Sequence, residues 1–240
     1  MRNIDINRVP APYTSALWSQ YEAGRVPVIP DIKCISPKEG DLLRGRDPVS
    51  LAKQLVQGGA RVLSVVTEPE HFGGTPQLLE NIAAETKVPV LRKDFIREKR
   101  HLIETKAIGA SAVLLIAAML EQKQLFQLIE DALSLGLEPL VETHNEEEIR
   151  SIQHLDLTFV GINNRNIIDL ELDDGTVSRT EQLVSSVPKH AFILSESGIQ
   201  TPEDVKRAYD AGAHGVLVGT AILQAQDPVD MYQRMNIARG

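Results

Sequence analysis

The sequence predicts an α/β protein whose fold is a single (β/α)8 TIM barrel with a short N-terminal helical extension. Eight short apolar runs follow one another at a mean spacing of roughly 27 residues, a pattern typical of strands covered on both faces. Amphipathic segments lie between the runs, and this alternation implies a parallel sheet with right-handed crossovers. The chain has 240 residues, which suits one such barrel. We expect residues 1–25 to form the extension and residues 26–240 the barrel, within one domain.

Each predicted strand is rich in Val, Ile or Leu. The eight runs are 26–33, 62–67, 88–94, 112–117, 137–144, 157–165, 191–197 and 214–220. The sequence lacks the G-x-G-x-x-G turn that an open dinucleotide-binding sheet would need. A closed barrel is therefore favoured over an open, doubly wound sheet.

The predicted helices carry recognisable start and stop signals. They occupy 11–24, 47–60, 75–86, 98–110, 121–136 and 201–213. The segment 47–60 begins with Asp47 as N-cap and Pro48 at the first helical position, and it stops at Gly58-Gly59. Two further helices open with Thr followed by Pro, so the same βα unit repeats along the chain.

Composition and charge narrow the class of protein. A formal net charge of −8 argues against a nucleic-acid surface, and no run approaches the ~18 apolar residues of a membrane span. The N-terminus has no apolar leader, so we expect a cytoplasmic protein. The single Cys34 excludes an internal disulfide and is interpreted as packing. The six histidines show no metal-ligand spacing, so we expect neither metal nor cofactor, and a monomer or weak homo-oligomer.

Charged and polar residues end several of the predicted strands. In this fold the active site lies at the carboxyl ends of the strands. The residues found there are Asp31, Lys33, Lys93, Glu142, Asn163, Glu196 and Ser197. Alternation along a strand places Asp31 and Lys33 on one face, towards the barrel axis, and Glu142 and Glu196 can also point inward. Buried charges are costly unless they are paired or used, so this mouth indicates general acid–base chemistry.

A second group of residues suggests a phosphate site. Gly198 and Gly219 follow the seventh and eighth runs, the usual position for a phosphate in this fold. Thr220 is expected both to cap a short helix over 220–223 and to donate its hydroxyl, since a helix N-terminus favours anions. Ser36, after the first run, lies across the mouth. Each glycine alone could be an ordinary turn, but together these residues favour phosphate binding.

The motifs resemble those of the indole-3-glycerol phosphate synthase family. They include "IKCISPKEG", "VPVLRKDFI", "GINNRN", "SESGI" and "VLVGTAIL", in order from about residue 26 to the C-terminus. The resemblance implies a (β/α)8 barrel enzyme of tryptophan biosynthesis, without metal or organic cofactor. Such an enzyme cyclises 1-(2-carboxyphenylamino)-1-deoxyribulose 5-phosphate to indole-3-glycerol phosphate, releasing carbon dioxide and water.

The resemblance also implies roles for individual residues. Lys33 and Lys93 match the two catalytic lysines and Glu142 the acid–base carboxylate. Asn163 and Glu196 would orient the substrate and the lysines, and Arg165 would hold the substrate carboxylate, with Ser197 in contact with substrate. The phosphate residues would be Ser36, Gly198, Gly219 and Thr220, and the ring pocket would be lined by Phe72, Phe95 and Leu114.

Two departures from the family pattern leave alternatives open. The first strand usually carries a glutamate, whereas Asp31 is one methylene shorter, and Pro30 removes a ladder N–H from a central strand. The N-terminal segment is short where the family often has a longer segment reaching over the ring. A paralogue that acts on a related sugar phosphate therefore stays open. A non-catalytic barrel that binds a phosphorylated ligand is the third hypothesis, although it would not need Lys33, Lys93 and Glu142.

Overall fold

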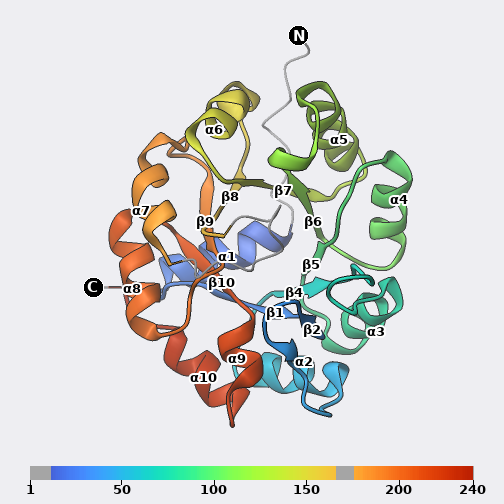
Figure 1. Ribbon diagram of the computed structural model, residues 1–240, viewed down its shortest axis with the longest axis vertical. Helices are drawn as coiled ribbons and strands as arrows, with labels where there is room; N and C mark the ends of the chain where they lie inside the picture. Colours follow the sequence, from blue (N-terminus) through green and yellow to red (C-terminus); the bar gives the residue numbers. More distant parts are fainter. Residues whose placement is uncertain (1–11, 166–175, 240) are drawn as a thin grey trace.

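A computed structural model, described here over residues 12–165 and 176–239, shows a closed barrel of eight parallel strands. The strands are β1 (Val28–Ile32), β4 (Leu63–Val66), β5 (Val90–Lys93), β6 (Ala112–Ile116), β7 (Glu138–Thr143), β8 (Phe159–Asn163), β9 (Phe192–Glu196) and β10 (Gly215–Val218). Each lies within one of the eight predicted runs. The predicted (β/α)8 fold is therefore confirmed (Figure 1).

The barrel closes through β1, which pairs with the last strand and with the second. Val28 is in register with Val216 of β10, and Asp31 is in register with Ser64 of β4. Pro30 lies inside β1, in register with Val218, and the strand is nevertheless part of the closed sheet. The missing N–H of Pro30 thus does not remove the strand from the barrel.

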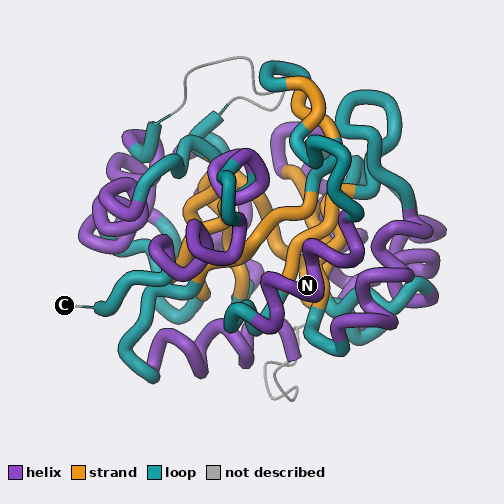
Figure 2. The backbone as a smooth tube through the Cα atoms, turned by 90° about the horizontal axis from the view of Figure 1, so that it is seen from below, coloured by secondary structure: helices purple, strands orange, loops and turns teal. Residues whose placement is uncertain are grey.

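Helices surround the strands on the outside, except α1, which lies across one end of the barrel (Figures 1 and 2). They are α1 (Pro12–Glu22), α2 (Pro48–Gln57), α3 (Pro76–Thr86), α4 (Lys99–Ala107), α5 (Gln122–Ser134), α6 (Glu146–Ile152), α7 (Ser178–Leu183), α8 (Pro202–Ala211), α9 (Thr220–Gln224) and α10 (Pro228–Met235). The predicted cap of α2 is present, because the Asp47 side chain accepts a hydrogen bond from the Ser50 N–H. None of the helices within the described ranges combines the length and apolar character that crossing a membrane requires.

Some elements were not predicted. The loop after β1 folds into a small antiparallel hairpin of β2 (Ile35–Ser36) and β3 (Gly40–Asp41). Helices α6, α7 and α10 also lie in segments without a predicted helix. The start of α10 repeats the Asp-Pro signal of α2, with Asp227 capping the Val229 and Asp230 N–H groups, so this helix was recognisable from sequence.

The apolar residues form an inner and an outer core. The inner core fills the barrel with side chains such as Leu140, Leu194, Phe159 and Phe192. The outer cores lie between the strands and the surrounding helices. Leu140 and Leu194 stand two positions before Glu142 and Glu196, so alternation carries these two carboxylates onto the inner face above the apolar core.

Helix α1 closes the amino-terminal end of the barrel. The Tyr13 hydroxyl donates to the Leu63 carbonyl at the start of β4, and the Tyr13 N–H donates to Glu138 at the start of β7. Trp18 packs edge-to-face on Phe192 at the start of β9. This helix therefore covers the end of the barrel opposite the mouth and does not reach over the predicted ring pocket. Residues 1–11 of the predicted extension lie outside the described residues.

Candidate active site

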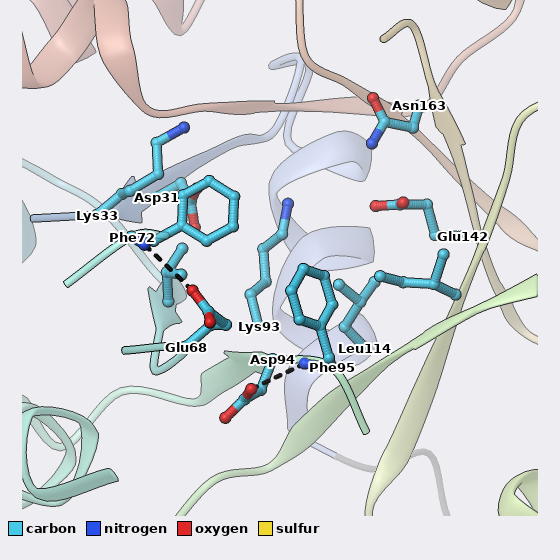
Figure 3. A pocket seen from close by; sticks show the side chains of 12 residues that line it. Asp31, Lys33, Glu68, Phe72, Lys93, Asp94, Phe95, Leu114, Glu142 and Asn163 are labelled. Atoms are coloured by element: carbon cyan, nitrogen blue, oxygen red, sulfur yellow. Dashed lines mark hydrogen bonds between the residues drawn. The ribbon is translucent and has the colours of Figure 1, made fainter. Parts of the chain in front are cut away.

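Two adjoining cavities open at the carboxyl ends of the strands and share Asp31, Lys33 and Lys93. The first is lined also by the predicted residues Phe72, Phe95, Leu114, Glu142 and Asn163 (Figure 3). The second is lined also by Arg165, Ser197, Gly198, Gly219 and Thr220. The barrel thus brings together most of the predicted site residues, from strands that lie far apart in sequence.

A buried ion pair lies at the base of the mouth. Lys93 Nζ is 3.1 Å from Glu196 Oε2, and the Glu196 side chain is fully buried. In Figure 3 the Lys93 side chain rises between the rings of Phe72 and Phe95. Since Lys93 ends β5 and Glu196 ends β9, closure of the barrel is what brings the ammonium and the carboxylate together.

Two of the buried carboxyl groups at the mouth, Glu196 and Glu142, have pKa values that move in opposite directions. Burial, together with the charges of Glu142 and Asp31, raises the pKa of Glu196 to about 7 against the attraction of Lys93. Burial also acts to raise the pKa of Glu142, but hydrogen bonding to His144 and the charge of Lys93 outweigh it and lower that pKa. A site with one readily protonated carboxyl and one persistent carboxylate has both partners of acid–base chemistry.

The Asp31 carboxylate is held by the neighbouring strand. The Ser64 hydroxyl donates to Asp31 Oδ1 at 2.6 Å, and both side chains are buried. Lys33, two positions further along, places its Nζ 5.4 Å from the centre of the Phe72 ring. The interpretation that Asp31 and Lys33 share the face towards the barrel axis agrees with their positions in both cavities.

The segment after β8 is held by a network of hydrogen bonds. Asn163 Oδ1 accepts from the Arg165 N–H at 3.0 Å, and Arg179 of α7 donates to the Asn163 and Arg165 carbonyls. Asn164 donates to Ser195 and to the Glu196 carbonyl. These contacts tie the end of β8 to that of β9, so Asn163 and Arg165 keep a defined position beside Glu196.

Two residues that line the second cavity have an unusual backbone conformation. Ser197 and Gly198 both adopt left-handed conformations, with φ of 63° and 73°. For Ser197 this conformation is costly, and such strain concentrates at functional sites. A Cβ at position 219 would lie 3.3 Å from the Asp31 carbonyl oxygen, which is a tight contact, so glycine lets the chain after β10 pass close to β1.

Two details of the predicted phosphate group differ from expectation. Thr220 was predicted to cap the short helix, but α9 begins at Thr220 itself and Gly219 occupies the N-cap position. The prediction was wrong by one residue because β10 ends at Val218 and the chain turns already at Gly219. Ser36 is buried in the β2–β3 hairpin, where its hydroxyl accepts from the Glu39 N–H at 3.4 Å. It does not line either of the two cavities.

Residues that the sequence interpretation did not single out also shape the mouth. Glu68 follows the second strand, and its carboxylate accepts from the Glu70, His71 and Phe72 N–H groups at 2.8 to 3.1 Å. It thereby sets the turn that carries the Phe72 ring. The same strand-end reasoning, applied to the second run, would have found Glu68. No sequence signal indicated Ser64, because its role depends on the neighbouring strand.

Glu68, Glu70 and His71 also place possible metal-ligand atoms within 4.8 Å of one another. The three backbone hydrogen bonds to Glu68 explain its position without an ion. That the protein works without metal or organic cofactor stays a prediction.

The fold and the mouth point to the class of (β/α)8 barrel enzymes, and comparison with known proteins gives the family. Residues 3–235 match the family model described as "Indole-3-glycerol phosphate synthase". The chain belongs to the indole-3-glycerol phosphate synthase family, as its motifs predicted.

The chain is similar to three curated relatives that carry the name indole-3-glycerol phosphate synthase. The Pyrococcus furiosus protein is 43% identical over 213 residues, which cover 89% of this chain and 92% of the relative. The Thermococcus kodakarensis protein is 43% identical over 208 residues, covering 87% and 91%. The Kineococcus radiotolerans protein is 42% identical over 223 residues, covering 92% and 80%. The likeness therefore extends over nearly the whole barrel.

Proposed function

We propose that this protein is a carbon–carbon lyase that cyclises 1-(2-carboxyphenylamino)-1-deoxyribulose 5-phosphate to indole-3-glycerol phosphate, with loss of carbon dioxide and water. The observation that carries the proposal is the mouth itself. Lys33, Lys93 and Glu142 line one cavity, and this cavity adjoins a second one lined by glycine backbone and Arg165. Family membership supports the same reaction.

The lining of the two cavities suggests which part of the substrate binds in each. The aromatic ring would lie in the first cavity, against Phe72, Phe95 and Leu114. The phosphate would lie in the second, against the backbone of Gly198 and Gly219 and the Thr220 hydroxyl. Lys93 is shared by both cavities, so the ribulose carbon chain would pass beside it.

We assign proton transfers to the charged residues between the two ends. Lys93 or Lys33 protonates the ribulose carbonyl oxygen while the ring carbon attacks, and the other lysine assists dehydration. Glu142, with its lowered pKa, is suited to accept a proton, and Glu196 orients Lys93 from 3.1 Å. Arg165 would hold the substrate carboxylate with its planar guanidinium until carbon dioxide leaves. Ser197 and Asn163 would complete the substrate contacts.

We keep Ser36 in the proposed phosphate site on the condition that its hydroxyl changes its orientation. Its hydroxyl would have to turn from the Glu39 N–H towards the second cavity when a phosphate binds. A cytoplasmic location and a monomeric or weakly associating state also stay predictions of the sequence.

A second candidate function keeps the same machinery but uses a related arylamino or other sugar phosphate. The observation that favours it is Asp31, whose short side chain is held 2.6 Å from the Ser64 hydroxyl. A longer glutamate would extend further into the space beside Lys33. The Asp31→Glu variant distinguishes a change of substrate from a change of rate alone.

The purified protein, incubated with the carboxyphenylamino deoxyribulose phosphate, should produce indole fluorescence. Lys93→Ala should lower kcat by at least ~100-fold, because it removes an acid–base group and the partner of Glu196. Lys99→Ala is the matched control, since Lys99 forms an ion pair with Asp131 on the outside of the barrel. Its activity should equal that of the unsubstituted protein.

Other outcomes would separate the hypotheses. Tight binding without turnover, with turnover restored by Asp31→Glu, would support the related-substrate function. Absence of binding by any pentulose phosphate would contradict both enzymatic functions.

A further inference from the structure

We propose that His144 is a positioning residue for Glu142: its imidazolium bridges the carboxylates of Glu142 and Glu148 and holds Glu142 ionised at the mouth. The inference rests on the proposed function insofar as it assigns Glu142 a part in catalysis. The bridge itself is a property of the protein without substrate.

The geometry places the imidazole between two carboxylates. His144 Nε2 lies 3.3 Å from Glu142 Oε1, and His144 Nδ1 lies 3.2 Å from Glu148 Oε2. The His144 and Glu142 side chains are 8% and 1% exposed. The contact between Glu142 Oε1 and His144 Nε2 is an ion pair, and neither atom has a hydrogen-bond partner of good geometry among the residues that the structure describes. Each buried atom therefore depends on the other.

A neutral imidazole would not satisfy both contacts. It has one N–H, so one ring nitrogen would present a lone pair to a carboxylate, whereas the imidazolium donates from both nitrogens. The pKa of His144 reflects this: burial lowers it, but hydrogen bonding to Glu142 and Glu148 raises it to about 9. The geometry and the raised pKa both favour the imidazolium form of His144 at neutral pH.

The outer carboxylate is itself fixed by the start of α6. Glu148 Oε2 also accepts from the His144 N–H at 2.9 Å, and Glu148 Oε1 accepts from the Asn145 side chain at 2.6 Å. Asn145 in turn caps the helix by accepting from the Glu148 N–H. The stretch "THNEEE", residues 143–148, thus contains a strand end, a bridging imidazole and, four positions after the imidazole, its anchor.

The charges around Glu142 show what the bridge contributes. Besides His144, Lys93 and Asn163 favour its ionised form, while burial opposes it. Glu196 adds a like charge nearby when it is ionised. Without His144, the buried Glu142 carboxylate would still be near the Lys93 ammonium, but that ammonium also pairs with Glu196. The pKa of Glu142 would therefore rise.

The kinetic test measures kcat and KM between pH 5 and pH 9 for His144→Ala and His144→Gln. We expect kcat of His144→Ala to fall about tenfold or more with KM nearly unchanged, and the acidic limb of the kcat profile to move up by about one pH unit. The Gln variant keeps a donor near the Nε2 position and should recover part of the loss. His190→Ala is the matched control, because His190 pairs with Asp156 at 2.8 Å on the surface.

A second measurement does not depend on turnover. The imidazole nitrogens of His144, followed by NMR in the substrate-free protein, should report a cation at pH 7. The pKa of His144 should fall in both Glu142→Gln and Glu148→Gln. If the unsubstituted protein does not turn over the substrate, the proposed function fails, and this titration still decides the bridge.

Two results would overturn the inference. A neutral His144 at pH 7 would exclude the imidazolium bridge. An unshifted acidic limb in a His144→Ala variant that melts at the normal temperature would show that His144 does not act on Glu142.

Discussion

At the scale of single residues, the mouth depends on glycines as much as on charges. Gly161 of β8 lies beneath the Glu196 side chain, and a Cβ at position 161 would collide with Glu196 Oε1. The same Cβ would lie 3.3 Å from Leu140 Cδ1 in the inner core. The buried Lys93–Glu196 pair therefore requires the absence of a side chain on the strand next to it.

Gly161→Ala should consequently impair catalysis more than stability. The added methyl group displaces the Glu196 carboxylate from Lys93, and a misplacement of about 1 Å can cost ~100-fold in rate. We expect kcat to fall roughly 10- to 100-fold in a protein that still gives the circular dichroism spectrum of the unsubstituted barrel.

Gly215→Ala is the matched control for that experiment. Gly215 begins β10 at the other end of the barrel, where a Cβ would meet the Pro27 carbonyl at 2.8 Å and the Phe192 ring at 3.0 Å. It should lower the melting temperature and leave kcat of the folded protein intact. Equal activity of the Gly161→Ala and unsubstituted proteins would contradict the steric argument.

At the scale of elements, α1 acts as a plug for the amino-terminal end of the barrel. It reaches the strands through Tyr13, whose fully buried hydroxyl donates to the Leu63 carbonyl at 3.1 Å. It is also held by Glu138, which accepts from the Tyr13 and Thr14 N–H groups. Sequence identified the helix, but its position across the far end of the barrel became apparent only from these contacts.

Tyr13→Phe should destabilise the protein by about 1–2 kcal/mol, because it removes a buried hydrogen bond while leaving the ring packed. Urea unfolding at 25 °C measures the effect, and kcat should not change because α1 lies opposite the mouth. Tyr21→Phe, in the same helix, should have almost no effect, since the Tyr21 ring is partly exposed and stacks against Arg239. Similar losses for both variants would argue against a specific role of the Tyr13 hydroxyl.

At the scale of the whole molecule, the pH dependence of stability should reflect carboxyl groups buried at the two ends of the barrel. Burial raises the pKa of Glu138 to about 7, although hydrogen bonds from Thr14 and Tyr13 oppose the rise. Burial also raises that of Glu196 at the mouth to about 7. Both groups bind a proton in the folded protein more readily than in the unfolded chain.

The sign of the effect follows from this difference in proton binding. Between about pH 4.5 and 7 the folded state holds a proton on Glu138 that the unfolded state releases, so the unfolding free energy falls as pH rises. The Glu138→Gln variant has no carboxyl group at this position, so its unfolding free energy should fall less as pH rises. From pH 5 to pH 8 its unfolding free energy should gain up to about 3 kcal/mol relative to the unsubstituted protein. Parallel pH curves for the two proteins would contradict the raised pKa.

Local sequence patterns sufficed for the fold and for much of the site. Strand runs, helix caps and the alternation of side chains are properties of neighbouring residues, so they placed all eight strands and put Lys93, Glu142 and Glu196 at the same end of the barrel. Small or irregular elements such as the β2–β3 hairpin lack such a signal. Thr220 was misplaced by one position because sequence patterns do not locate the last residue of a strand.

What the sequence by itself determined is the list of chemical groups at the mouth and the family to which the chain belongs. Tertiary structure alone decided which of them meet: Lys93 with Glu196, Asp31 with Ser64, and His144 between Glu142 and Glu148. Lys93 and Glu196 lie 103 positions apart. Their contact depends on how the closed sheet sets one strand against another, and on glycines that leave room. Periodicity along one strand carries no information about that register.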